Sequence, residues 1–281
     1  MKTFIKKRLL TAFITTMTST SFVGLFVTLL PNIADWPIKF LIILGIAFIL
    51  FVTISLILIF VKKRTIGSFN NVKISAMYGD VLKIKKKKKG SIPVVVIPVN
   101  SAFDYIVEEK LNQRAPIVSK KTIHGQWIIK LTQGKEELIE QLGKEINHSI
   151  QEMSPKIVET LKEKRGNQTN YELGSHIFIE RDDCGYLLFA LSEFDENNHV
   201  KEKMKSVYCE LIKKLMDATD GCQGRDAYIP IMGTGLSLFG ISHKDAFEEI
   251  KAAALNKKMS LKSNINIVVF YGDIKKASIY D

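Results

Sequence analysis

The chain has 281 residues, a formal net charge of +11 and 46% hydrophobic residues, with a mean hydropathy of +0.08. This composition excludes a disordered or fibrous chain, and it indicates that apolar residues are concentrated in one region. The three cysteines are spaced neither as a disulfide framework nor as zinc ligands, so we expect a reducing compartment: Cys184, Cys209 and Cys222.

The first 64 residues contain two long runs without charge, Leu9–Leu30 and Phe40–Val61. At about 1.5 Å of rise per residue, each is long enough to cross a hydrocarbon core of about 30 Å. These runs predict a transmembrane hairpin over residues 1–64 with spans at 9–30 and 40–61. A cleaved signal peptide is the alternative for the first run, but a second span follows it directly.

Basic residues at Lys6–Arg8 and Lys62–Arg64 flank the two runs. By the positive-inside rule they predict a multi-pass protein with both termini in the cytoplasm. Residues 65–71 are then a linker and 72–281 a cytosolic domain. Most of the positive charge lies at the membrane flanks and in Lys85–Lys89, so no basic face is left for nucleic acid. Lys85–Lys89 is expected to be a loop, with anionic lipid as the alternative contact.

In residues 72–281, short apolar runs alternate with amphipathic segments. We expect strands within Val72–Ile84, broken at Gly79-Asp80, and at Ile92–Val99, His176–Glu180, Tyr186–Leu191, Ala227–Met232 and Ile265–Tyr271. We expect helices at Tyr105–Leu111, Lys135–Arg165 with a break at Pro155, His199–Ala218 and Ser242–Leu255. This alternation predicts an α/β fold, a three-layer α/β/α domain with a largely parallel sheet.

A glycine-rich loop, Gly233-Thr-Gly235, joins the predicted strand Ala227–Met232 to a helix. Glycines let backbone N–H groups approach an anion, and a helix N-terminus adds partial positive charge. In an open α/β sheet, ligands bind beyond the carboxyl ends of the strands, where this loop lies. The loop therefore predicts an anion site, with a tight turn that binds nothing as the alternative.

Two further strand ends carry polar residues. Asn100 and Ser101 follow one strand, where they form either a ribose site or a structural Asx turn. Gly79-Asp80-Val81 follows another, where a carboxylate can accept a hydrogen bond from an adenine amino group.

These three motifs, in this order, resemble those of macro domains, the α/β/α modules that bind ADP-ribose. Macro domains carry a Gly-Asp-Ile turn, a Val-Asn-Ala-Ala-Asn strand end and a Ser-Thr-Gly loop; the counterparts here are Gly79–Val81, Val99–Phe103 and Met232–Gly235. The resemblance extends from about Val72 to the end of the chain. It implies a contact to adenine from Asp80, with Val81 as a further ligand-binding residue beside it. It implies contacts to the distal ribose from Asn100 and Ser101, and to the diphosphate from Gly233, Thr234, Gly235 and Leu236.

The sequence departs from hydrolytic macro domains at Phe103, where these have a second Asn, and at Asp104–Glu108, which replaces a glycine cluster. The departures imply a domain that binds its ligand without catalysis. The five histidines show no metal-ligand spacing, so we expect no metal and no cofactor. The segment Ile117–Trp127 stands in place of the glycine cluster and is a candidate to bind the ligand instead. Within it, His124 and Gly125 are candidates for the far end of the ligand, and an ordinary surface histidine is the alternative.

Two spans followed by a divergent macro domain resemble the membrane effectors of type II Thoeris antiphage systems. The resemblance implies that a TIR-domain enzyme makes an ADP-ribose derivative, expected to be a histidine conjugate. The effector, placed in the bacterial inner membrane, then binds this signal, forms a homo-oligomer and disrupts the lipid bilayer. A membrane-tethered ADP-ribosyl or nucleotide hydrolase and a ligand-free scaffold are the two alternatives.

Overall fold

The computed structural model describes residues 13–18, 36–60, 62–86, 90–109, 115–222, 224–235 and 237–280. The chain divides into two compact units, Met1–Lys63 and Arg64–Asp281. Each unit is described by itself below.

In the first unit, residues 13–18 are helical and α2 covers Trp36–Phe60. Among the described residues, no helix combines the length and the apolar character that crossing a membrane requires. A spanning helix needs about 20 consecutive apolar residues, and the described side chains of α2 are those of residues 41–54. This finding overturns the predicted transmembrane hairpin and the multi-pass placement in a bacterial inner membrane. The rest of the predicted first span lies outside the described residues.

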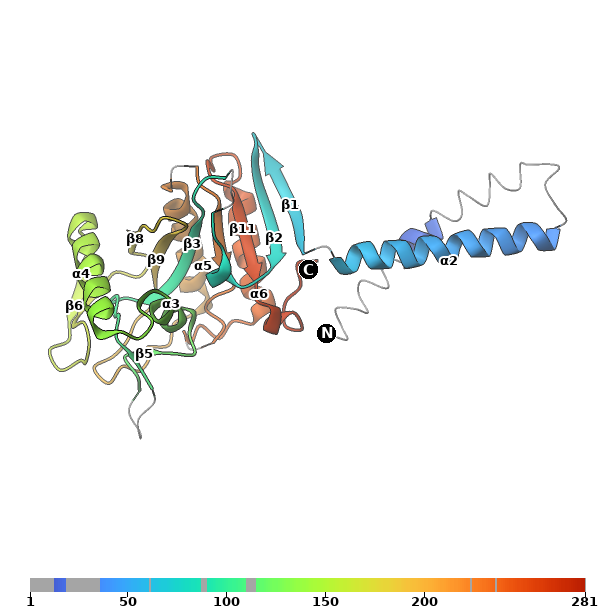
Figure 1. Cartoon of the computed structure of the whole chain (residues 1–281). Coiled ribbons are helices and arrows are strands. Elements are labelled where there is room, and N and C mark those ends of the chain that lie inside the picture. The colour runs from blue at the N-terminus through green and yellow to red at the C-terminus, as the bar shows by residue number, and fades with distance from the viewer. Residues whose placement is uncertain are drawn as a thin grey trace. The chain divides into compact units, whose positions relative to one another are not determined.

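The second unit is built on a seven-stranded sheet with the order β1-β2-β11-β10-β3-β9-β8 (Figure 1). The strands are β1 (Lys63–Phe69), β2 (Val72–Tyr78), β3 (Val94–Asn100), β8 (His176–Ile179), β9 (Gly185–Ser192), β10 (Ala227–Pro230) and β11 (Ile265–Val269). The five strands from β2 to β9 in this order pair in parallel, and β8 pairs antiparallel with β9. The predicted largely parallel sheet is confirmed.

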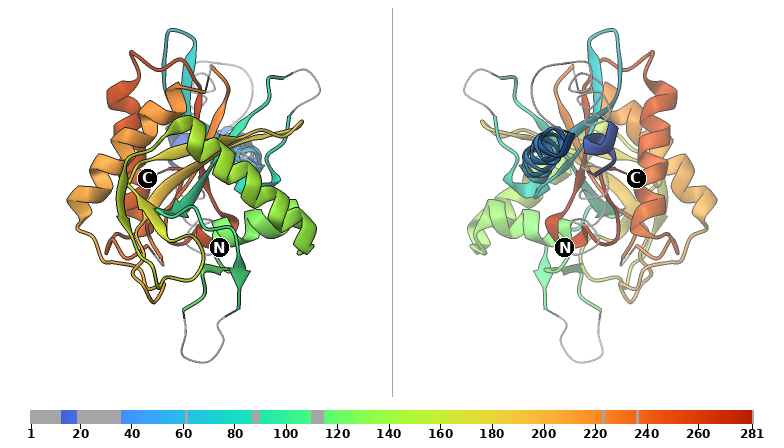
Figure 2. Two further views of the ribbon diagram at one scale, coloured as in Figure 1. Left: turned by 90° about the vertical axis from the view of Figure 1, so that its left-hand side faces the viewer. Right: turned by 90° about the vertical axis from the view of Figure 1, so that its right-hand side faces the viewer.

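Helices cover both faces of this sheet. They are α3 (Ile123–Thr132), α4 (Glu136–Met153), α5 (Lys205–Asp220) and α6 (His243–Lys257). Figure 2 shows α4 on the opposite side of the sheet from α5 and α6. On the α4 side, alternate residues of β3 (Val95 and Ile97) join one buried core with Trp127 of α3 and Ile146 of α4. The domain is therefore a three-layer α/β/α sandwich, as predicted.

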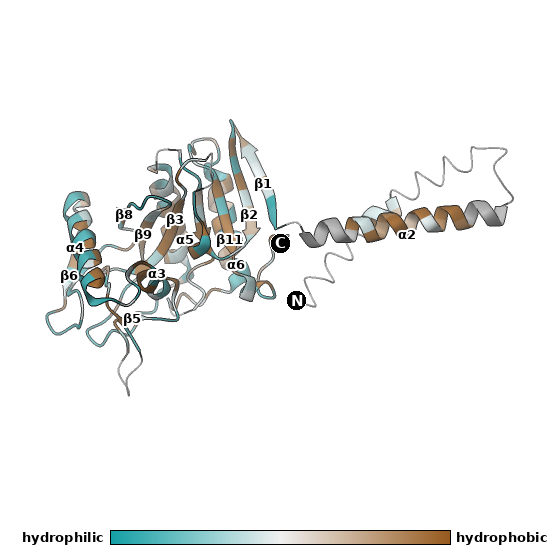
Figure 3. Cartoon of the chain, in the orientation of Figure 1, coloured by the Kyte–Doolittle hydropathy of each residue, from teal (hydrophilic) through white to brown (hydrophobic). Residues whose placement is uncertain are grey.

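The hydrophobic pattern explains this arrangement. The central strand β3 is fully buried from Val94 to Ile97, as expected for a parallel strand covered on both faces. Figure 3 shows hydrophobic residues concentrated in the sheet and alternating with hydrophilic ones along α4. The buried stripe of α4 is Leu142, Ile146 and Ile150, at the spacing of one helix face.

Short elements complete the unit. β4 (Val107–Glu108) pairs in parallel with β5 (Val118–Ser119), and β6 (Ile157–Thr160) pairs antiparallel with β7 (Thr169–Tyr171). The 3₁₀ turns are η1 (Val81–Lys83) and η2 (Tyr271–Asp273).

Several predicted boundaries near the start of the domain are wrong. Residues 65–71 are for the most part strand β1, because they pair with the sheet where a linker was expected. The second strand expected within Val72–Ile84 is the turn η1, because Asp80 caps it by accepting from the backbone N of Leu82. Lys85 ion-pairs with Asp183 at 3.4 Å, and residues 87–89 lie outside the described residues.

Three helix predictions also need correction. The helix expected at Tyr105–Leu111 does not form in the described residues of that range, 105–109, where β4 lies instead. Asp104, the expected helix cap, uses its carboxylate to accept a hydrogen bond from Lys164. The helix expected over Lys135–Arg165 ends at Met153, because Ser154 is left-handed and Pro155 follows. Helix α5 begins at Lys205, six residues later than predicted.

Candidate functional site

The carboxyl ends of five neighbouring strands form one edge of the sheet. At this edge β2 is followed by Gly79-Asp80, β11 by Phe270 and β10 by the loop that contains Gly233, while β3 and β9 end at Asn100 and Ser192. In open α/β sheets, ligands bind at this edge. All three predicted motifs therefore lie on the edge where a ligand is expected.

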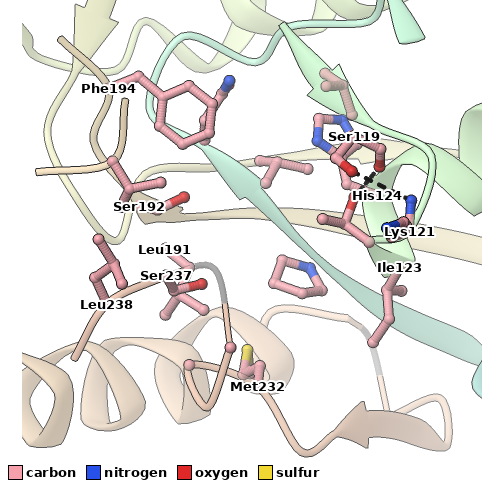
Figure 4. Close-up of a pocket in the computed structure, with 18 of the residues that line it drawn as sticks. Ser119, Lys121, Ile123, His124, Leu191, Ser192, Phe194, Met232, Ser237 and Leu238 are labelled. Carbon is pink, nitrogen blue, oxygen red and sulfur yellow. Dashed lines mark hydrogen bonds between the residues drawn. The ribbon is translucent and has the colours of Figure 1, made fainter. Parts of the chain in front are cut away.

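Two adjoining cavities open along this edge. The smaller, of about 340 Å³, lies over the ends of β2 and β11. The larger, of about 650 Å³, lies over the ends of β10, β3 and β9 (Figure 4), and its volume is typical of a small-molecule site. Lys121, Ile123 and Ile231 line both cavities. The two cavities therefore form one elongated cleft.

The smaller cavity contains the Gly79–Val81 motif. Asp80 accepts from the backbone N of Leu82 at 3.0 Å, and its carboxylate lies 3.7 Å from Lys83 Nζ. The aromatic ring of Phe270, which the sequence motifs did not indicate, is half-exposed and lines the same cavity. This end of the cleft offers a carboxylate and an aromatic face, as a flat, hydrogen-bonding ring requires.

The glycine-rich loop lies at the junction of the cleft. Gly233 has φ +81°, and a Cβ there would lie 2.5 Å from the ring of Tyr208, so this position accepts only glycine. A Cβ on Gly235 would have no atom within 4 Å. The Oγ1 of Thr234 shares a hydrogen bond of 3.2 Å with Nε2 of His243. Gly233, Thr234 and Gly235 all line the larger cavity. Leu236 lies outside the described residues.

Asn100 lines the larger cavity, while Ser101 does not. The carboxamide of Asn100 donates from Nδ2 to Asp104 Oδ2 at 2.8 Å and accepts from the Asp104 backbone N at 3.1 Å. The fully buried Ser101 donates from Oγ to Asn170 Oδ1 at 3.0 Å. Asn100 therefore lies in the cleft wall, and its side chain binds Asp104, four residues on, without forming the predicted Asx turn. The side chain of Ser101 joins the residue after β3 to Asn170 of β7.

Helix α3 brings His124 to the cleft but turns Gly125 away from it. Thr122 caps the helix by accepting from the Gly125 backbone N at 3.0 Å. A Cβ on Gly125 would lie 2.3 Å from the backbone O of Ser119, so this glycine permits close packing. His124 lines the larger cavity and is 5% exposed.

Charge in the cleft comes from few groups. Burial lowers the pKa of His124 to about 3, although a hydrogen bond between its ring and the Asp104 backbone acts on the pKa in the opposite direction. The ring is therefore neutral at physiological pH. Lys121 is exposed at the junction of the two cavities, and no ion-pair partner lies within reach of its Nζ among the described residues. A cation there suits an anionic ligand segment.

The segment Ile117–Trp127, singled out in the sequence, contributes residues 117–119 and 121–124 to the larger cavity, but no motif indicated Ala115, Pro116 or Asn198. Thr122 precedes an apolar run as an N-cap does, and this is the sequence signal for the start of α3 at the cavity. Asn198 carried no such signal, because it reaches the cleft from a turn after β9.

Comparisons with known proteins give a family match and distant structural neighbours. No curated protein matches the chain. The Oceanobacillus iheyensis macrodomain with MES bound is 10% identical with a TM-score of 0.47, over 78% of this chain and 93% of that one. The same macrodomain with ADP is 11% identical with a TM-score of 0.47, over 78% and 92%. A mutant with ADPR is 12% identical with a TM-score of 0.49, over 78% and 94%.

The family assignment rests on the sequence, since these structural neighbours are distant. The family model described as "Thoeris protein ThsA, Macro domain" matches residues 74–270, which extend from β2 to the residue after β11 and include every motif at the edge of the sheet. The chain therefore belongs to the Thoeris ThsA macro domain family.

Proposed function

We propose that this domain binds an ADP-ribose derivative along the elongated cleft and acts as a signal receptor in Thoeris defence. The observation that carries the proposal is the continuity of the cleft. The smaller cavity, which contains Asp80, and the larger cavity, which contains Asn100, share Lys121, Ile123 and Ile231, and the glycine-rich loop lies beside these residues. Such a cleft suits a long ligand with an anionic middle. Membership of the ThsA macro domain family supports the same ligand class.

Each part of the cleft matches one part of that ligand. Adenine lies against Asp80 and Phe270 in the smaller cavity. The diphosphate lies at Gly233–Gly235 and Lys121, where backbone N–H groups and a cation favour negative charge. The distal ribose lies against Asn100, which has one further donor and one further acceptor position beyond its bonds to Asp104.

We further propose binding without turnover. Phe103, at the position where hydrolytic macro domains have a second Asn, is fully buried and packs on Tyr171 with ring centroids 6.0 Å apart. It therefore brings no polar group to the cleft. The hydrolase alternative predicts release of products from ADP-ribosylated protein, and a chromatographic assay with the purified full chain tests it.

Isothermal calorimetry of the full chain with ADP-ribose tests the binding proposal. Saturable binding to ADP-ribose, and much weaker binding to AMP, is expected because AMP fills only the smaller cavity. Absence of binding to ADP-ribose would refute it. The TIR-made histidine conjugate and ligand-driven self-assembly stay predictions from the resemblance, and sizing the chain with and without the conjugate tests both.

A further inference from the structure

One nitrogen of a histidine contacts a residue from each of the two cavities. His243 is the first residue of α6, and its Nε2 lies 3.2 Å from Oγ1 of Thr234 in the glycine-rich loop. The same Nε2 lies 3.5 Å from Oδ1 of Asp273 in η2. Thr234 lines the larger cavity and Asp273 lines the smaller one, while His243 lines neither. The imidazole therefore joins the two cavities from outside the cleft.

The carboxylate of Asp273 selects the nitrogen of His243 that carries a proton. A carboxylate oxygen only accepts, so the Nε2 beside it is favoured in its protonated, donating form. A donating Nε2 makes the hydroxyl oxygen of Thr234 the acceptor of their shared hydrogen bond. The hydroxyl then keeps its own hydrogen for another acceptor. Because Thr234 lines the larger cavity, an anionic oxygen of a ligand suits this role.

Few charged groups act on the ring of His243. Partial burial lowers its pKa, the carboxylate of Asp273 raises it, and the ammonium of Lys276, which pairs with Asp273 at 2.8 Å, lowers it. The glycine-rich loop contributes no ionisable side chain, and the acid in the first turn of α6, Asp245, accepts from Ser242 Oγ at 2.8 Å. The ring is therefore neutral near pH 7, and a negative charge placed beside Thr234 would favour the imidazolium.

We propose that His243 is a positioning residue for the nucleotide, which holds the Thr234 hydroxyl toward the diphosphate and takes up a proton from solvent when the diphosphate binds. The inference rests on the proposed function, because it requires the diphosphate to lie at the glycine-rich loop. The ring needs no contact of its own with the ligand, since it acts through Thr234. On its other side, Asp273 ties this arrangement to the wall of the smaller cavity.

Calorimetry of the full chain with ADP-ribose measures the proton. The diphosphate of ADP-ribose is a diester that does not titrate near neutral pH, so a proton taken up on binding enters the protein. We expect a binding enthalpy that depends on the ionisation enthalpy of the buffer, and an affinity at least about threefold higher at pH 6 than at pH 8. His243→Gln keeps an N–H donor but cannot titrate, so it should lose both effects and retain most of the affinity at pH 8. His148→Gln, at an exposed histidine of α4, should keep both effects.

A double-mutant cycle tests whether the ring acts through Thr234. His243→Leu should weaken ADP-ribose binding at pH 8 at least about tenfold. In Thr234→Val the same change should weaken it less than about threefold, because the hydroxyl that the ring positions is already missing. His243 is partly exposed, so we expect folded variants, and thermal unfolding checks this.

Three results overturn the inference. They are an absence of proton uptake by the wild type, uptake that persists in His243→Gln, and an equal loss from His243→Leu with and without the Thr234 hydroxyl. Each of them leaves the binding of ADP-ribose itself in place. Absence of ADP-ribose binding by the wild type refutes the proposed function, and this inference with it.

Discussion

The side chains of Lys164 and Asp104 form a buried ion pair beneath the cleft: Nζ lies 2.7 Å from Oδ2, and the side chains are 0% and 1% exposed. The same Oδ2 accepts from Nδ2 of Asn100, and Oδ1 accepts from the backbone N of Asn167 at 2.6 Å. Lys164 therefore orients Asp104, and through it the asparagine in the cavity wall.

Removing the lysine should destabilise the domain. Lys164→Met leaves the Asp104 carboxylate buried without its counter-charge, which costs about 3–5 kcal/mol of unfolding free energy. Urea unfolding followed by circular dichroism measures this loss. Lys162→Met, at an exposed position in the same loop, is the matched control. A loss of less than 1 kcal/mol in Lys164→Met would contradict the importance of the pair.

The two glycines of the loop should respond differently to substitution. Gly235→Val should lower the affinity for ADP-ribose at least about tenfold with little change in stability, because its side chain enters open space in the cleft. Gly233→Ala should lower stability by about 1–3 kcal/mol, since it forces a positive φ and a contact with Tyr208. Calorimetry and thermal unfolding of both variants check this. Unchanged binding in Gly235→Val would place the diphosphate elsewhere.

Lys121 should contribute to affinity through its charge. Lys121→Gln should weaken ADP-ribose binding about tenfold at low salt, because a charge beside a diphosphate contributes about 1–4 kcal/mol near a protein surface. The difference should shrink as salt is added. Titrations at two salt concentrations measure it, with Lys120→Gln as the control, since Lys120 pairs with Glu109 and lines neither cavity. Equal affinities for Lys121→Gln and the control would exclude the role.

The buried His124 should make the domain sensitive to acid. Its pKa is lowered to about 3 in the folded chain and is about 6.5 when unfolded, so below pH 6.5 the unfolded chain binds the proton and the folded one does not. Between pH 7 and pH 5 this costs about 2 kcal/mol of stability. His124→Gln should remove that part of the pH dependence, measured by urea unfolding at both values. His148→Gln, at an exposed histidine, should retain it.

Much of the domain could be predicted because its buried strands carry local signals. Val94–Ile97 is a continuous apolar run, and the β8–β9 hairpin is bounded by polar turn residues, so all three strands follow from the sequence. The Gly233 loop was also found from its strand–glycine–helix order. These features depend on neighbouring residues, which a sequence displays directly.

The parts that the sequence did not predict depend on distant contacts. Strand β1 contains Gly67 and Ser68 and is a strand only because the sheet offers it a partner. Asp104 looked like a helix cap, but its carboxylate binds Lys164, sixty residues away. Asn198 reaches the cleft only once the turn after β9 is folded. The membrane hairpin was inferred from hydropathy alone, and among the described residues no helix meets the requirement.

The position of β11 in the sheet has a consequence for when the site forms during synthesis. β11, at residues 265–269, is inserted between β2 and β10, so the two cavities cannot be brought together before this strand leaves the ribosome. Pairing of β2 with β11 closes a very long loop, which is a slow step in folding. A nascent chain that has emerged only as far as α6 therefore has no continuous cleft, and ligand recognition begins only after β11 has emerged and paired with β2 and β10.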